Sequence, residues 1–90
     1  MRKPETFGEY ITAALQQQGY SERQLSKRVG VANSTLVRIR NGSIPEPDLF
    51  ISIIETLDLD VTIAAQLIDP YRRLYERIIS TTTQKGDKNE

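Results

Sequence analysis

Apolar residues recur at helical spacing along most of the chain and predict a series of short helices. The first set is Phe7, Tyr10, Ile11, Ala14 and Leu15, which follows the i, i+3, i+4, i+7, i+8 pattern of one helix face. A threonine precedes the set, with a glutamate three residues further on, in the order of a capping box. These signals predict a helix over about residues 6–18.

A second, shorter helix is predicted to start at Ser21, because a serine accepts hydrogen bonds from the first free amides of a helix. Leu25 and Val29 lie one turn apart on its apolar side. Gly30 ends it, since glycine adopts the left-handed backbone at little cost. The chain is therefore expected to turn sharply after residue 29.

A third helix is predicted from about Asn33, with Leu36 and Ile39 on its apolar side and a stop at Asn41-Gly42. Four other side chains of this helix supply an amide, two hydroxyls and a guanidinium, which match base edges and phosphates in a major groove. They belong to Asn33, Ser34, Thr35 and Arg38.

The rest of the chain predicts three further helices. A proline-containing connector over residues 44–47 leads into a helix over 47–57 with a broad apolar stripe. A fifth helix follows an aspartate cap and reaches about residue 68, and a sixth covers 69–80. Residues 81–90 contain no large apolar residue and are expected to be a disordered tail, as residues 1–5 are expected to be a flexible arm. The predicted fold class is all-α, a compact bundle of five short helices with a sixth, C-terminal helix.

Charge is segregated along the chain although the net charge is zero. Residues 21–42 hold five basic residues and one acidic residue, whereas residues 43–69 hold six acidic residues and no basic one. A basic region on an acidic body is typical of a protein that brings one face to nucleic acid.

The composition limits the chemistry of the chain. It has no cysteine and no histidine, which removes thiol nucleophiles, the usual zinc ligand sets and the commonest general base. We therefore expect no enzyme activity, no metal site and no cofactor. The N-terminus lacks the apolar core of a signal peptide and no run approaches a membrane span, so a cytoplasmic protein is expected.

The segment from Ser21 to Gly42 resembles the helix-turn-helix of the lambda and 434 repressor and Cro family, the Xre-like regulators. The resemblance extends to residues 7–67 and rests on the buried and turn positions of the helix pair and on its Arg-Asn-Gly exit at residues 40–42. The buried and turn positions are Leu25, Ser26, Val29, Gly30, Val31, Leu36 and Ile39. It implies a domain over residues 6–68 that binds double-stranded DNA, in a protein of bacterial or phage origin.

The resemblance also implies roles for the exposed residues. The positions that match the family's base contacts are Asn33, Ser34 and Arg38, although Arg38 can instead hold a phosphate. The positions that match backbone contacts are Ser21, Arg23, Thr35, Arg40, Asn41 and Ser43, where Ser21 can serve as a cap alone.

Three positions depart from the family pattern. Glu22 stands where a glutamine often contacts phosphate, so a nearby cation is needed to neutralise it. Ala32 stands where a serine or threonine cap is usual, which leaves Asn33 as an alternative cap. Arg40 stands where the family often has glutamate, which removes an internal ion pair and adds positive charge near the DNA.

The sixth helix is more apolar than a solvated terminal helix requires, and we predict that it forms a homodimer contact. The predicted dimer residues on this helix are Tyr71, Leu74, Tyr75 and Ile78. The resemblance implies that the fifth helix also takes part in the dimer contact, through Ile63 and Leu67. The alternative is that Tyr71, Leu74 and Ile78 fold back onto their own domain and enlarge its core.

The expected function is sequence-specific regulation of transcription, as a repressor that binds a palindromic operator as a homodimer. One alternative is an antitoxin that also regulates its own synthesis, with the acidic second half or the C-terminal helix and tail contacting a protein partner, the toxin. Another is a protein-interaction adaptor that kept the fold but lost DNA binding, which the zero net charge, Glu22 and the acidic run favour. No membrane association is expected.

Overall fold

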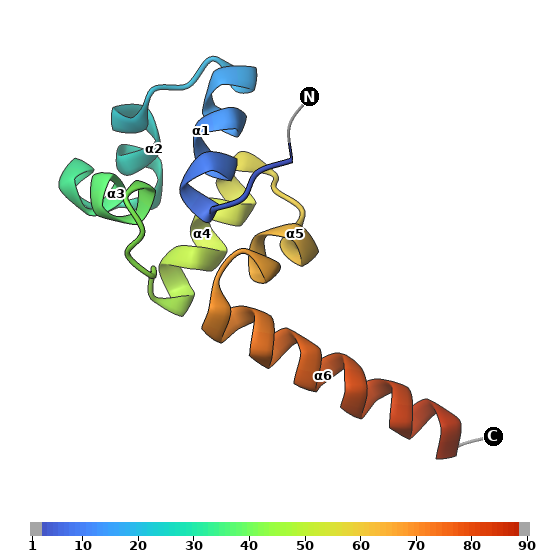
Figure 1. The fold of residues 1–90 in the computed structure, drawn as a ribbon. Coiled ribbons are helices and arrows are strands. Elements are labelled where there is room, and N and C mark those ends of the chain that lie inside the picture. The colour runs from blue at the N-terminus through green and yellow to red at the C-terminus, as the bar shows by residue number, and fades with distance from the viewer. Residues whose placement is uncertain (1–2, 89–90) are drawn as a thin grey trace.

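The computed structural model describes residues 3–88, and that part of the chain contains six helices and no strand (Figure 1). The helices are α1 (Phe7–Gln18), α2 (Glu22–Val29), α3 (Asn33–Arg40), α4 (Pro47–Leu57), α5 (Val61–Gln66) and α6 (Asp69–Lys88). The predicted all-α fold is confirmed.

Local hydrogen bonds explain why the first helices begin and end where they do. The Thr6 hydroxyl oxygen accepts the Glu9 amide at 3.0 Å and starts α1. A complete capping box starts α2, because Ser21 accepts from the Gln24 amide and the Gln24 side chain accepts from the Ser21 amide. Gly30 ends α2 with φ +75°, in the left-handed region that favours glycine. These ends lie within one residue of the predicted ones.

One apolar core holds the first five helices together. α1 packs against α3 and α4, and α2 packs against the same two helices. The three largest fully buried side chains, Leu25, Ile53 and Leu57, come from α2 and α4. This core fixes α2 and α3 as one rigid pair on the side of the molecule away from the end of α6 (Figure 1).

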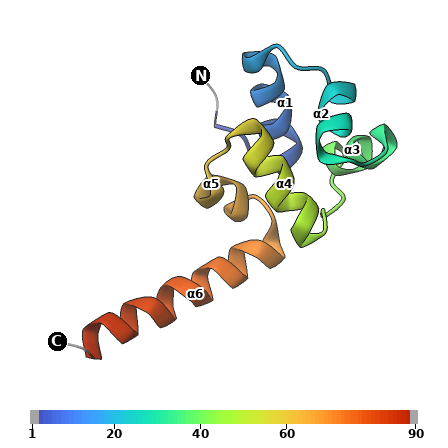
Figure 2. The same ribbon diagram turned by 180° about the vertical axis from the view of Figure 1, so that it is seen from behind.

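α6 extends away from the other helices, and both views show its far end pointing away from α2 and α3 (Figures 1 and 2). It begins at Asp69 and runs to Lys88, so the disordered tail predicted from residue 81 is wrong as far as residue 88. Residues 89–90 lie outside the described residues. Once a helix has formed, each added residue gains one hydrogen bond, so polar composition alone does not end a helix.

The predicted N-terminal arm is described only in part, because residues 1–2 lie outside the described residues. Lys3 to Glu5 precede α1 without regular secondary structure, and the Glu5 amide donates to the Glu9 carboxylate at 2.9 Å. The glutamate of the predicted capping box therefore bonds one residue before the cap itself. Within residues 3–88, no helix is both long enough and apolar enough to cross a membrane.

Candidate nucleic-acid interface

Helix α3 separates an apolar side from a polar side. Leu36 and Ile39 are buried, each 3% exposed, and hold the helix on the core. Asn33, Ser34 and Arg38 are exposed. The structure therefore places the three predicted base-contacting residues on the solvent side of one short helix, and none of the three packs in the core.

The start of α3 carries no side-chain cap. Ala32 occupies the N-cap position and makes no side-chain hydrogen bond, and Asn33 is the first helical residue. Asn33 therefore does not replace the missing cap, and its amide side chain stays available for a partner. The amides of the first turn of α3 are also left without a side-chain acceptor, and the positive end of the helix dipole suits an anion.

The exit of α3 uses its backbone amides internally. Gly42 donates to the Ile39 carbonyl at 3.0 Å and Ser43 donates to the Arg38 carbonyl at 2.9 Å, which is the Schellman arrangement, with Gly42 at φ +116°. Asn41 donates to the Val37 carbonyl at 3.0 Å. Contacts from Asn41 and Ser43 to a DNA backbone must therefore come from their exposed side chains and not from these amides.

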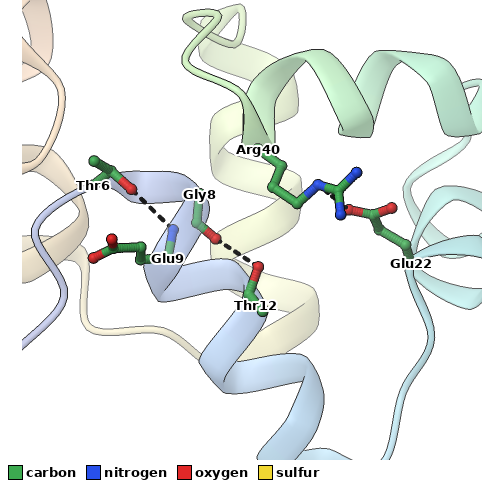
Figure 3. Close-up of polar contacts among 6 residues, drawn as sticks. All are labelled: Thr6, Gly8, Glu9, Thr12, Glu22 and Arg40. Carbon is green, nitrogen blue, oxygen red and sulfur yellow. Dashed lines mark hydrogen bonds and ion pairs between the residues drawn. The ribbon is translucent and has the colours of Figure 1, made fainter. Parts of the chain in front are cut away.

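An ion pair joins the start of α2 to the end of α3 (Figure 3). The Nε atom of Arg40 lies 3.2 Å from a carboxylate oxygen of Glu22, with side chains 46% and 23% exposed. A pair this exposed contributes about 0–1 kcal/mol. The two departures from the family pattern thus compensate one another, because Arg40 supplies the cation that Glu22 needs. Arg40 was expected to remove an internal ion pair of the family, and the structure shows that it forms another one with Glu22.

Gly8 lies on α1 beside Arg40 at the end of α3 (Figure 3). It is buried, and a Cβ atom there would overlap the carbonyl oxygen of Arg40 and reach its carbonyl carbon at 2.9 Å. The absence of a side chain at Gly8 therefore sets the position of the Arg40 backbone. Sequence reasoning missed this residue, although a glycine inside the apolar stripe of a helix was a usable signal.

The predicted backbone-contacting residues come from the start of α2, from α3 and from its exit. Ser21 is exposed, and its hydroxyl oxygen serves as a cap while its own hydrogen remains free to donate to a phosphate. Arg23 is exposed and Thr35 is half-buried. The site combines hydroxyl, amide and guanidinium donors with no buried charge.

The predicted dimer residues fall into two groups. Tyr71, Tyr75 and Leu67 are half-buried and pack against the core of their own domain. Ile63, Leu74 and Ile78 remain 43–55% exposed. The fold-back alternative, which concerned Tyr71, Leu74 and Ile78, therefore agrees with the structure at Tyr71 and not at Leu74 or Ile78. The exposed apolar surface therefore lies on α5 and on α6 from Leu74 to Ile79, where Val61 and Ile79 add to the predicted residues.

The comparisons with known proteins agree with this geometry. The family model described as helix-turn-helix matches residues 11–63, which include all of α2, α3 and α4. No curated protein and no solved structure matches the chain. The matched family is a DNA-binding regulatory domain and not an enzyme family. The chain belongs to the helix-turn-helix family of lambda repressor-like, Xre-type DNA-binding transcription regulators.

Proposed function

We propose that this protein is a repressor that binds a palindromic operator as a homodimer and reads bases with α3. The observation that carries the proposal is the exposure of Asn33, Ser34 and Arg38 on a helix whose apolar side is buried. An asparagine can pair bidentately with adenine, and an arginine can pair with O6 and N7 of guanine, each pair discriminating by about 1–3 kcal/mol.

Backbone contacts are assigned to the residues around this face. Ser21 and Arg23 at the start of α2 and Thr35 on α3 can hold phosphates, which fix the position of a protein on the duplex without reading its sequence. Asn41 and Ser43 add exposed side chains at the helix exit. Arg40 is shared between Glu22 and the DNA, so its contribution depends on how far the ion pair opens.

A second copy of the chain is the proposed occupant of the exposed apolar surface. Ile63, Leu74 and Ile78 would each lose apolar area from water on pairing, which stabilises a dimer. Two copies related by a two-fold axis would place their α3 helices about 34 Å apart, on successive turns of one face of the duplex. A palindromic operator follows from this symmetry.

The test is selection of bound duplexes from a random library, run in parallel on the wild type and on an Asn33→Ala, Arg38→Ala variant. We expect the wild type to enrich a palindrome and the variant to lose it, because both substituted side chains are exposed and leave the core unchanged. A folded wild type that enriches no duplex would contradict the proposal and favour the adaptor.

A salt series adds a second criterion. Affinity for an enriched duplex should fall with salt at a log–log slope of about −0.9 for each phosphate held. This slope counts phosphates that are neutralised by a basic side chain, so an affinity that does not change with salt would contradict the assignment of backbone contacts to Arg23 and Arg40.

A further inference from the structure

The connector between α3 and α4 is attached at both ends. At one end, the Ser43 amide donates to the Arg38 carbonyl in α3 at 2.9 Å. At the other end, the carbonyl of buried Pro45 accepts a hydrogen bond of 2.6 Å from the hydroxyl of Tyr71 in α6. Proline restricts its own φ and the conformation of the residue before it, so Ile44 and Pro45 form a stiff segment between these bonds.

Tyr71 is itself held firmly in the domain. Its ring stacks on the ring of Phe50, with the two centroids 4.4 Å apart and the two planes 20° apart. The centroid of the Phe50 ring lies 5.2 Å from that of Phe7. Burial, and next the negative charge of Glu46, raise the pKa of Tyr71 above its ordinary value. The hydroxyl therefore stays protonated at physiological pH and donates its hydrogen to Pro45.

The connector also shapes the surface beside the base-reading helix. A hollow of about 340 Å³ lies between α3 and the connector, and its lining includes Thr35, Arg38, Ser43 and Ile44. Ile44 is 57% exposed there. A shift of the connector would therefore move the side chain of Ser43 and reshape the surroundings of Arg38, both of which the proposed function places against DNA.

We infer that Tyr71 is a positioning residue for DNA binding, because it holds the connector beside α3 and so links the seating of α6 to the DNA-binding surface. The inference rests on the proposed function, since it concerns how that same surface is held. Tyr71 itself contacts no DNA. Loosening its hydroxyl bond would let Ser43 and Arg38 lose their fixed positions relative to one another.

Tyr75 provides a matched control for Tyr71. It is also a half-buried tyrosine of α6, and its hydroxyl lies 3.1 Å from the Thr62 hydroxyl in α5, away from the connector. Tyr71→Phe and Tyr75→Phe each remove one hydrogen bond between α6 and the domain and keep the ring. A general loss of α6 docking would therefore affect both variants alike.

The experiment compares the affinity of the wild type, Tyr71→Phe and Tyr75→Phe for the duplex that the wild type enriches. Hydrogen exchange of the Ser43 amide is measured in the free proteins. We expect Tyr71→Phe alone to weaken DNA binding and to speed Ser43 exchange, each by roughly two- to tenfold, from the net contribution of one hydrogen bond. Equal effects in the two variants, or no effect of Tyr71→Phe, would overturn the inference.

The two proposals fail in different ways. A wild type that enriches no duplex contradicts the proposed function, whatever the two variants do. Exchange at Ser43 is measured without DNA, so an unchanged rate in Tyr71→Phe contradicts the positioning role even when the wild type binds DNA well.

Discussion

The α2–α3 pair and the projecting part of α6 expose opposite kinds of side chain. In α2 and α3 the large aliphatic residues Leu25, Leu36 and Ile39 are 1–3% exposed, and the solvent side is polar or charged. On α6, Leu74, Ile78 and Ile79 are 44–55% exposed. One surface therefore suits a hydrogen-bonding, anionic partner and the other suits an apolar one. The zero net charge of the chain gives no sign of the basic α2–α3 pair, because the acidic residues of 43–69 offset its positive charge.

The largest expected effect tests the α6 side of the comparison. Ile78→Asp places a charge in the proposed dimer contact and removes a side chain whose burial stabilises it by about 1.5–3 kcal/mol, which corresponds to about a 10- to 150-fold rise in the dimer dissociation constant. Sedimentation equilibrium measures this constant. DNA affinity should fall with it, since one α3 helix binds weakly without its partner.

Ile51→Asp is the matched control for Ile78→Asp. Ile51 lies on α4 and is 52% exposed, against 55% for Ile78, so the two substitutions change similar amounts of exposed apolar surface. The Ile51 variant should remain dimeric. Equal weakening of the dimer by both substitutions would show that the contact is not confined to α6 and would contradict the comparison.

The next largest effect tests the packing that supports α3. Gly8→Ala forces a methyl group against the Arg40 carbonyl, and overpacking of this kind costs about 1–3 kcal/mol. Helix propensity alone predicts the opposite sign, because alanine is favoured over glycine inside a helix by about 1 kcal/mol. Chemical denaturation decides between the two. A variant more stable than the wild type would show that α1 does not fix the end of α3.

A smaller effect on stability is expected from the N-caps, which differ between α2 and α3. α2 has a complete capping box, whereas Ala32 at the start of α3 makes no side-chain hydrogen bond. Ala32→Ser should raise the free energy of unfolding by about 1 kcal/mol, because the hydroxyl oxygen can accept an amide of the first turn. Thermal unfolding measures the gain, and Ser21→Ala should produce a loss of similar size. If Ala32→Ser does not raise the free energy of unfolding, the amides in the first turn of α3 already have adequate hydrogen-bond partners.

The smallest effect concerns the ion pair. Glu22→Gln should lower stability by less than about 1 kcal/mol, since both charged side chains are partly exposed. It should also free Arg40 for a phosphate and steepen the salt dependence of DNA binding by about 0.9 in log–log slope. Glu55→Gln on α4 makes the same change in net charge outside the helix pair. If the salt dependence of DNA binding has the same slope in these two variants, Arg40 does not contact a phosphate.

Local signals made most of the fold predictable. Ser21, Gly30 and Pro47 each set a helix boundary through their own hydrogen bonding or backbone geometry, so the boundary could be predicted without knowing the rest of the structure. The end of α6 was not predictable in this way, because the residues just after Ser80 contain neither glycine nor proline.

Contacts between distant residues could not be predicted. Glu22 and Arg40 each departed from the family pattern when considered alone, and only the packing of α2 on α3 shows that they meet. Tyr71 was predicted to lie in a dimer contact, with packing on its own domain as the alternative, and no local pattern indicated its hydrogen bond to Pro45. The exposed, polar side of α3 was predictable, because helical periodicity alone separates Leu36 and Ile39 from the exposed residues.

The most direct test of the central claim is the affinity of three proteins for the enriched duplex with each base pair changed in turn. The proteins are the wild type, Asn33→Ala and Arg38→Ala. The wild type should lose about 1–3 kcal/mol at each contacted base pair. Each variant should become indifferent at the position that its missing side chain reads and still discriminate at the others. If both substitutions instead weaken binding equally for every duplex, as the loss of a phosphate contact does, α3 does not read bases through these residues.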